Sequence, residues 1–142
     1  EVSSFDPTGP AAGGSFSSGG AAGRAAIAAS IAETGGFWAP LPADDFAGQG
    51  LTDEQIARIV DRATPHPGAS LTEPAHLSRP LTELSATYIK CLLDWPQPSD
   101  DVAELLKSER WRLVEMNTGH WPMLSQPQEL AGVLCESAEP AR

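Results

Sequence analysis

Hydrophobic residues gather in the second half of the chain into two short runs, each followed by turn-forming residues. The first run, residues 87–93, is almost continuously apolar, which is typical of a strand covered on both faces in a parallel sheet. The second run covers residues 111–116. Between them, Ser99 can cap a helix that extends to about Lys107. The order strand, helix, strand predicts a crossover unit of a parallel α/β sheet.

Two further helices are predicted from capping-box spacings. Thr52 and Gln55 stand three residues apart before a helical stripe of apolar residues, so they predict a reciprocal cap at the start of that helix. Ser125 and Gln128 have the same spacing and predict the start of a final helix, with Leu130, Val133 and Leu134 facing inward.

The chain divides into three stretches by composition. Residues 1–34 begin with a Gly-, Ser- and Ala-rich segment without periodicity, which we expect to be mobile, and they end in a short helix over residues 24–33. Residues 35–84 contain six of the 13 prolines and the aromatic residues Phe37, Trp38 and Phe46, with one clear helix. Residues 85–142 carry the two predicted strands and their helices.

Charge and cysteine content narrow the classes of function. A net charge of −10 disfavours binding to nucleic acids or to anionic membrane surfaces, and no apolar stretch is long enough to span a bilayer. Cys91 and Cys135 lack the spacing of a metal site, and the three histidines do not cluster with other ligands. We therefore expect no metal and no cofactor, and two buried, reduced thiols in a cytoplasmic protein.

Two residues with acid–base chemistry follow the predicted strands. Asp94 closes the first hydrophobic run, and His120 follows the second run on a loop led by Gly119. The carboxyl ends of parallel strands meet at one rim, where open α/β sheets place their functional residues. A carboxylate that accepts from one imidazole nitrogen fixes the tautomer and leaves the other nitrogen free to take a proton. We expect Asp94 and His120 to form such a pair.

Three segments carry a family resemblance: Thr64-Pro65-His66-Pro67, Tyr88-Ile89-Lys90-Cys91-Leu92-Leu93-Asp94 and Gly119-His120-Trp121-Pro122-Met123-Leu124, with Pro127 after the last. Together they resemble the C-terminal half of an α/β-hydrolase, and most of all its small esterase and hydroxynitrile-lyase branch. The resemblance implies a partial α/β-hydrolase fold, in which the last two parallel strands with flanking helices lie beneath a mainly helical cap formed by residues 35–84. It makes Asp94 the acid and His120 the base of a catalytic triad.

The sequence departs from this family at two points. No Gly-x-Ser-x-Gly motif occurs, so we expect a fragment that supplies the acid and base of the triad but not the nucleophile, and that needs the N-terminal half of the hydrolase core as its partner. The lyase members carry a lysine directly after the catalytic histidine, where this chain has Trp121. A small-molecule ester is therefore favoured as substrate over a cyanohydrin. The alternative is a non-catalytic interaction module that docks onto a separate N-terminal half.

Four apolar residues are candidates for a substrate pocket. Trp121 and Met123 follow the histidine and are as well suited to core packing as to lining an acyl or alcohol pocket. Phe37 and Trp38 lie in the aromatic part of the predicted cap, where they can face a substrate or simply form the core of the cap.

Overall fold

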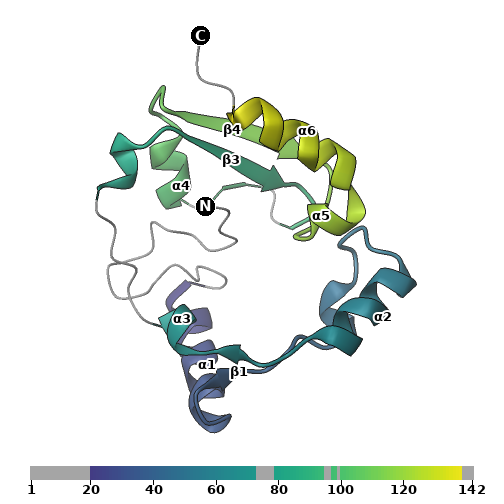
Figure 1. The fold of residues 1–142 in the computed structure, drawn as a ribbon. Coiled ribbons are helices and arrows are strands. Elements are labelled where there is room, and N and C mark those ends of the chain that lie inside the picture. Colours follow the sequence, from purple (N-terminus) through teal and green to yellow (C-terminus); the bar gives the residue numbers. More distant parts are fainter. Residues whose placement is uncertain (1–19, 73–78, 95–96, 99, 139–142) are drawn as a thin grey trace.

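The fold is described from a computed structural model, in which residues 20–72, 79–94, 97–98 and 100–138 are described (Figure 1). Short helices and two small sheets alternate along the chain. In order they are α1 (Gly20–Glu33), β1 (Phe37–Trp38), the 3₁₀ turn η1 (Ala43–Phe46), α2 (Asp53–Arg62), β2 (His66–Pro67), α3 (Ala69–Thr72), the 3₁₀ turn η2 (Leu81–Glu83), β3 (Ala86–Cys91), α4 (Asp100–Leu105), β4 (Trp111–Met116), α5 (Pro122–Ser125) and α6 (Pro127–Ala138).

The predicted crossover unit is confirmed. Strands β3 and β4 pair in parallel, from Ala86 opposite Trp111 to Cys91 opposite Met116, and α4 lies between them in sequence. Figure 1 shows α6 running alongside β4. The first strand is shorter than its hydrophobic run, because the chain already turns at Leu92, which is exposed. The architecture is thus mixed α/β with a two-stranded parallel sheet in the described part of the chain.

The capping box of α2 is confirmed by both of its hydrogen bonds. The backbone N–H of Gln55 donates to the Thr52 hydroxyl over 3.2 Å, and the backbone N–H of Thr52 donates to the Gln55 side chain over 2.9 Å. The Gln55 amide nitrogen also donates to the carbonyl of Leu124 over 2.7 Å, which ties α2 to the C-terminal part of the chain.

The predicted cap at Ser125 is wrong. Ser125 is the last residue of the short helix α5, and its hydroxyl donates to the Trp121 carbonyl over 3.1 Å and contacts the Thr118 hydroxyl. The final helix begins instead at Pro127, whose fixed φ and missing N–H suit the first position of a helix. Gln126 therefore separates two helices, α5 and α6, where the sequence pattern predicted one helix beginning near Ser125.

The N-terminal elements differ in detail from the prediction. The short helix is present but begins at Gly20, and it ends before Gly35 and Gly36, whose φ angles of 71° and 96° are left-handed conformations that favour glycine. The segment expected to be mobile lies outside the described residues apart from its end. Strands β1 and β2, two residues each, pair antiparallel where the sequence indicated no regular element.

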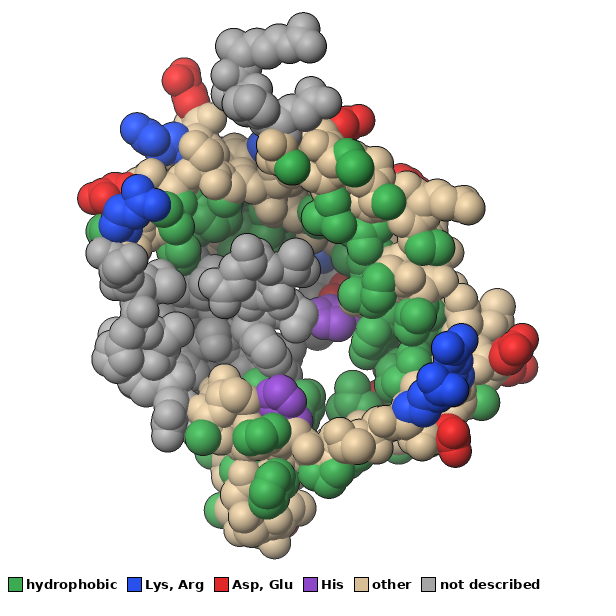
Figure 2. Space-filling view, in the orientation of Figure 1, with side chains coloured by type: hydrophobic (Ala, Val, Ile, Leu, Met, Phe, Trp, Pro, Cys, Tyr) green, Lys and Arg blue, Asp and Glu red, His purple; other side chains and the backbone are tan. Residues whose placement is uncertain are grey.

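Buried apolar side chains are few and are spread over the elements. They are Ile31, Phe46, Leu71, Val102, Leu105 and Met116. Figure 2 shows an opening through the middle of the molecule, bordered in part by histidine and hydrophobic side chains. In the described part of the chain, no helix combines the length and the apolar character needed to cross a membrane.

Candidate active site

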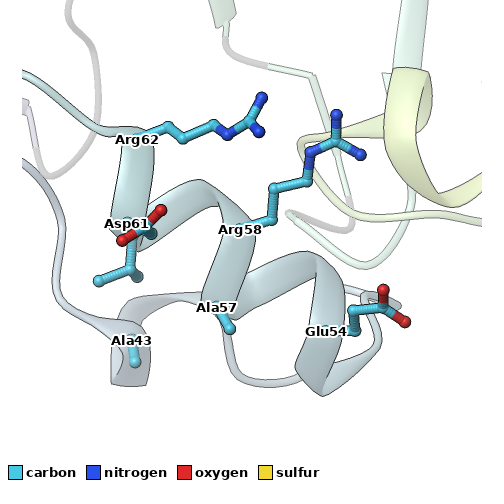
Figure 3. A pocket seen from close by; sticks show the side chains of 7 residues that line it. Ala43, Glu54, Ala57, Arg58, Asp61 and Arg62 are labelled. Atoms are coloured by element: carbon cyan, nitrogen blue, oxygen red, sulfur yellow. The ribbon is translucent and has the colours of Figure 1, made fainter.

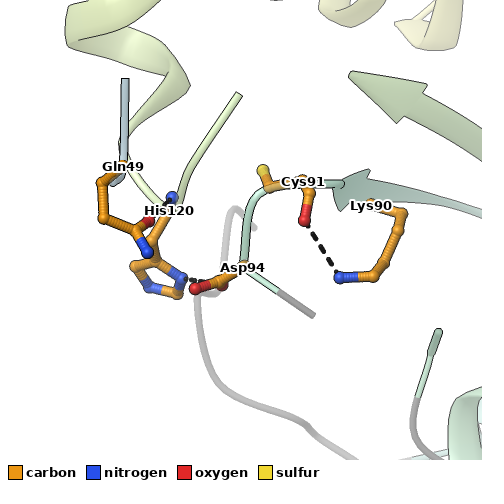
Figure 4. A network of polar contacts seen from close by, with 5 residues as sticks. All are labelled: Gln49, Lys90, Cys91, Asp94 and His120. Atoms are coloured by element: carbon orange, nitrogen blue, oxygen red, sulfur yellow. Dashed lines mark hydrogen bonds and ion pairs between the residues drawn. The ribbon is translucent and has the colours of Figure 1, made fainter. Parts of the chain in front are cut away.

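Asp94 and His120 lie in hydrogen-bond contact at the carboxyl end of the parallel sheet. The imidazole Nδ1 of His120 is 2.9 Å from Oδ2 of Asp94 (Figure 4). Backbone bonds continue the strand pairing into both loops, since the N–H of Leu92 donates to Met116 over 3.0 Å and the N–H of Leu93 donates to Thr118 over 3.1 Å. The sheet itself therefore brings the carboxylate and the imidazole together, as their positions after the two strands predicted.

The chemistry of the partners settles which nitrogen of His120 carries the proton. An ionised carboxylate only accepts hydrogen bonds, so Nδ1 must donate to Asp94 and, in the neutral ring, Nε2 is left as an acceptor. The pair is partly open, with 43% of the His120 side chain and 25% of the Asp94 side chain exposed. Even with the ring protonated, an ion pair this accessible contributes only about 0.2–1 kcal/mol to stability. Stability alone therefore gives little reason for this arrangement.

The loop that carries His120 is held by contacts with α5 and with Gln126, the residue after α5. Thr118, two residues before the histidine, is almost fully buried, and its hydroxyl contacts that of Ser125. Pro122 is buried at the first turn of α5. The side-chain amide of Gln126 donates to the Asn117 carbonyl over 3.0 Å. These contacts hold the residues before and after Gly119 and His120, and the His120 side chain is exposed.

A residue from the predicted cap binds the backbone of the histidine. The N–H of His120 donates to Oε1 of Gln49 over 2.7 Å. Close approach is possible because Gly119 has no side chain: a Cβ atom there would lie 2.2 Å from Oε1 and 2.5 Å from the carbonyl oxygen of Gln49. Figure 4 shows Gln49 and Asp94 on opposite sides of His120.

Trp121 lies between the histidine and the buried Phe46. Its ring centroid is 4.7 Å from that of Phe46 and 5.2 Å from the imidazole, with the latter pair edge-on. Half-buried in this position, Trp121 packs the predicted cap against the histidine loop and forms an apolar wall next to the imidazole.

The other pocket candidates lie elsewhere. Met123 is in α5 with 52% of its surface exposed, directly after the histidine loop. Phe37 and Trp38 form β1, which pairs with β2. Figure 1 shows β1 far around the molecule from the end of β3. The structure thus brings Trp121 to the pair but does not bring Phe37 or Trp38 there.

Neither cysteine is fully buried, contrary to expectation. Cys135 is exposed on α6, and Cys91 is half-buried at the end of β3 rather than in mid-strand. Burial, and next the negative charge of Asp94, raise the pKa of the Cys91 thiol, while the positive charge of Lys90 lowers it. Lys90 is itself buried, and its ammonium donates to the Cys91 carbonyl over 3.0 Å. Burial and the neighbouring carboxylate therefore disfavour the thiolate form of Cys91.

Metal-binding clusters and surface hollows of the described structure do not extend the site at the pair. Within the described ranges, no cluster of His, Cys, Asp and Glu side chains could hold a metal ion. Figure 3 shows an open surface hollow along α2, to which Arg58 and Arg62 contribute. No side chain of the acid–base pair lines this hollow, so it adds nothing to the site at the sheet rim.

Gln49 was not among the residues singled out from the sequence. Its flanking glycines, Gly48 and Gly50, have φ angles of 76° and 72°, so a tight Gly-Gln-Gly turn was the available signal. A polar residue in such a turn is usually solvated, however, and its partner His120 is 71 residues away.

Comparisons with protein-family models, curated proteins and solved structures found no match to the chain.

Proposed function

We propose that the chain is part of a serine hydrolase of the α/β-hydrolase type, acting on small carboxylic esters, and that it supplies the acid and the base of the triad. The observation that carries this proposal is the bond between His120 Nδ1 and Asp94 Oδ2 at the carboxyl end of two adjacent parallel strands. The resemblance of the segments around these two residues to the C-terminal half of the family supports it.

The mechanism follows from the geometry of the pair. A serine hydroxyl attacks the ester carbonyl while Nε2 of His120 takes its proton, and Asp94 stabilises the resulting imidazolium through Nδ1. His120 then passes the proton to the oxygen of the departing alcohol, which leaves an acyl-serine. Water attacks this ester with His120 again as base, and the carboxylic acid is released. This route needs no cofactor.

The nucleophile is proposed to lie outside this chain, in an N-terminal half of the hydrolase core. The sequence contains no Gly-x-Ser-x-Gly motif. Two serine hydroxyls in the described part of the chain have side-chain partners other than His120: Ser70 bonds to His66, and Ser125 bonds to Thr118. A cytoplasmic location belongs to the same proposal.

The choice of an ester rests on the residue after the base. Trp121 puts an apolar indole next to the imidazole, where the lyase branch of the family has a lysine. An uncharged wall suits the acyl or alcohol part of an ester and offers no cation to stabilise cyanide. Ester hydrolysis is therefore preferred over cyanohydrin cleavage.

The test is ester hydrolysis by a longer chain, extended by the coding sequence upstream of Glu1. We expect an in-frame Gly-x-Ser-x-Gly motif there and hydrolysis of p-nitrophenyl acetate by the product. Asp94→Asn should lower kcat by roughly 10⁴-fold and His120→Ala by at least as much. His66→Ala is the matched control, because His66 is exposed and its ring bonds to the Ser70 hydroxyl, whereas the ring of His120 bonds to Asp94. Activity that is unaffected by His120→Ala would contradict the proposal.

A second candidate function is a non-catalytic module that docks onto a separate N-terminal half. It is favoured by exposed leucines around the sheet, such as Leu92, Leu93 and Leu113, and by a parallel sheet of two strands that pair only with each other in the described residues. Size-exclusion chromatography separates the cases in part, since a clean monomer would count against an exposed docking edge. A start codon with its own ribosome-binding site just upstream of Glu1 would favour the module.

A further inference from the structure

We infer that Gln49 is a positioning residue for the base: the turn that carries it binds the base loop, lies close to the acid loop and sets the position of the His120 backbone. This inference rests on the role proposed for His120. It is carried by the hydrogen bond from the His120 N–H to Oε1 of Gln49 and by the absence of a side chain at Gly119, which lets the two segments meet.

The turn is built to present one side chain. Gly48 and Gly50, on either side of Gln49, both have left-handed φ angles. A side chain at Gly48 would meet nothing within 4 Å, so glycine is needed there for its backbone conformation and not for space. The N–H of Gln49 donates to the carbonyl of the buried Phe46 over 3.3 Å, which anchors the turn to the aromatic packing beneath it.

The same turn binds the base loop and lies close to the acid loop. On the base loop, Gln49 approaches Gly119 so closely that even a methyl group there would lie 2.7 Å from the Gln49 Cα. On the acid loop, a Cβ atom at Gly50 would lie 3.5 Å from the side chain of Leu93, the residue before Asp94. The turn thus lies against the residues that directly precede the acid and the base.

This arrangement fixes His120 at two points. Asp94 holds the ring through Nδ1, and Gln49 holds the backbone nitrogen of the same residue. A ring bonded only at Nδ1 can still swing with its loop, whereas a residue held at ring and backbone keeps Nε2 in one place. Positional errors of about 1 Å at a catalytic group cost on the order of 10²-fold in rate, so a second anchor has a catalytic consequence.

The experiment uses the 142-residue chain, labelled with ¹⁵N and measured by NMR without any turnover. Gln49→Leu keeps the size of the side chain and removes the acceptor. We expect the His120 amide proton to move upfield and to exchange with solvent up to about tenfold faster, since one hydrogen bond contributes up to about 1.5 kcal/mol. Gln49→Glu retains an acceptor oxygen and should restore the downfield amide signal.

Gln55→Leu is the matched control. Its amide also bonds the C-terminal part of the chain, but at the Leu124 carbonyl and not at the histidine. We expect this variant to lose stability while the amide and ring ¹⁵N signals of His120 stay in place. An unchanged His120 amide in Gln49→Leu, or an equal change in Gln55→Leu, would overturn the inference.

The NMR result for Gln49→Leu can be distinguished from the result of the ester-hydrolysis test of the proposed function. If Gln49→Leu frees the His120 amide but hydrolysis by the longer chain does not require His120, the proposed function fails while the anchoring contact stands. If hydrolysis requires His120 but Gln49→Leu leaves the His120 signals unchanged, the anchoring inference fails alone.

Discussion

Replacing Gly119 by alanine is the sharpest test of the close contact between Gln49 and the loop that carries His120. Gly119 is not among the glycines with a left-handed φ, so alanine fits its backbone conformation and only space is at issue. The new Cβ atom would lie 2.2 Å from Oε1, 2.5 Å from the carbonyl oxygen and 2.7 Å from the Cα of Gln49. Two of these three atoms belong to the backbone, so rotation of a side chain cannot relieve the clash.

The expected loss of stability follows from these contacts. Inserting a methyl group into a filled site costs about 1–3 kcal/mol, and losing the hydrogen bond from His120 to Gln49 adds about 0.5–1.5 kcal/mol. Gly119→Ala should therefore lower the free energy of unfolding by about 1.5–4.5 kcal/mol, measured by urea denaturation with an unchanged slope.

The matched control is the same substitution on α6. A Cβ atom at Gly132 would meet nothing within 4 Å, and glycine in a helix interior is less stable than alanine by about 0.5–1 kcal/mol. Gly132→Ala should therefore stabilise the chain by about that amount. Equal stability of Gly119→Ala and the parent chain would refute the close contact with Gln49.

The remaining predictions concern the cap of α2 and the thiol near the site. Thr52→Ala removes the side-chain half of the capping box and should cost about 0.5–2 kcal/mol by urea denaturation; no measurable loss would contradict the observed cap. Iodoacetamide should alkylate Cys135 well before Cys91, because Cys135 is exposed while burial raises the pKa of Cys91. Removing the negative charge with Asp94→Asn should lower the Cys91 pKa and speed its alkylation, whereas Lys90→Met should do the opposite; pH-dependent alkylation followed by mass spectrometry checks both signs.

Local sequence patterns were sufficient to predict the sheet rim. The second strand matches its hydrophobic run of residues 111–116, and the residues after each strand, Asp94 and His120, meet because parallel strands end at the same edge. Where two local signals competed, the prediction was wrong: the Ser125 capping spacing was outweighed by Pro127, which begins the helix two residues later.

Contacts between distant segments could not be predicted in the same way. Strands β1 and β2 contain two residues each, too few to show an alternating pattern, and they form only because residues 37–38 and 66–67 meet. Gln49 bonds to the histidine 71 residues later, and the glycines around it indicate a turn but not what that turn contacts. The rim was therefore predictable from the sequence, while the contact of Gln49 with His120 was not.

The most direct test of the central claim is the ¹⁵N spectrum of the His120 imidazole at a pH where the ring is neutral. The account predicts a proton on Nδ1, donated to Asp94, and an unprotonated Nε2, with the proton redistributed between the two nitrogens in Asp94→Ala. A parent spectrum with the proton on Nε2, or one that Asp94→Ala leaves unchanged, would contradict the claim that these two residues form an acid–base pair.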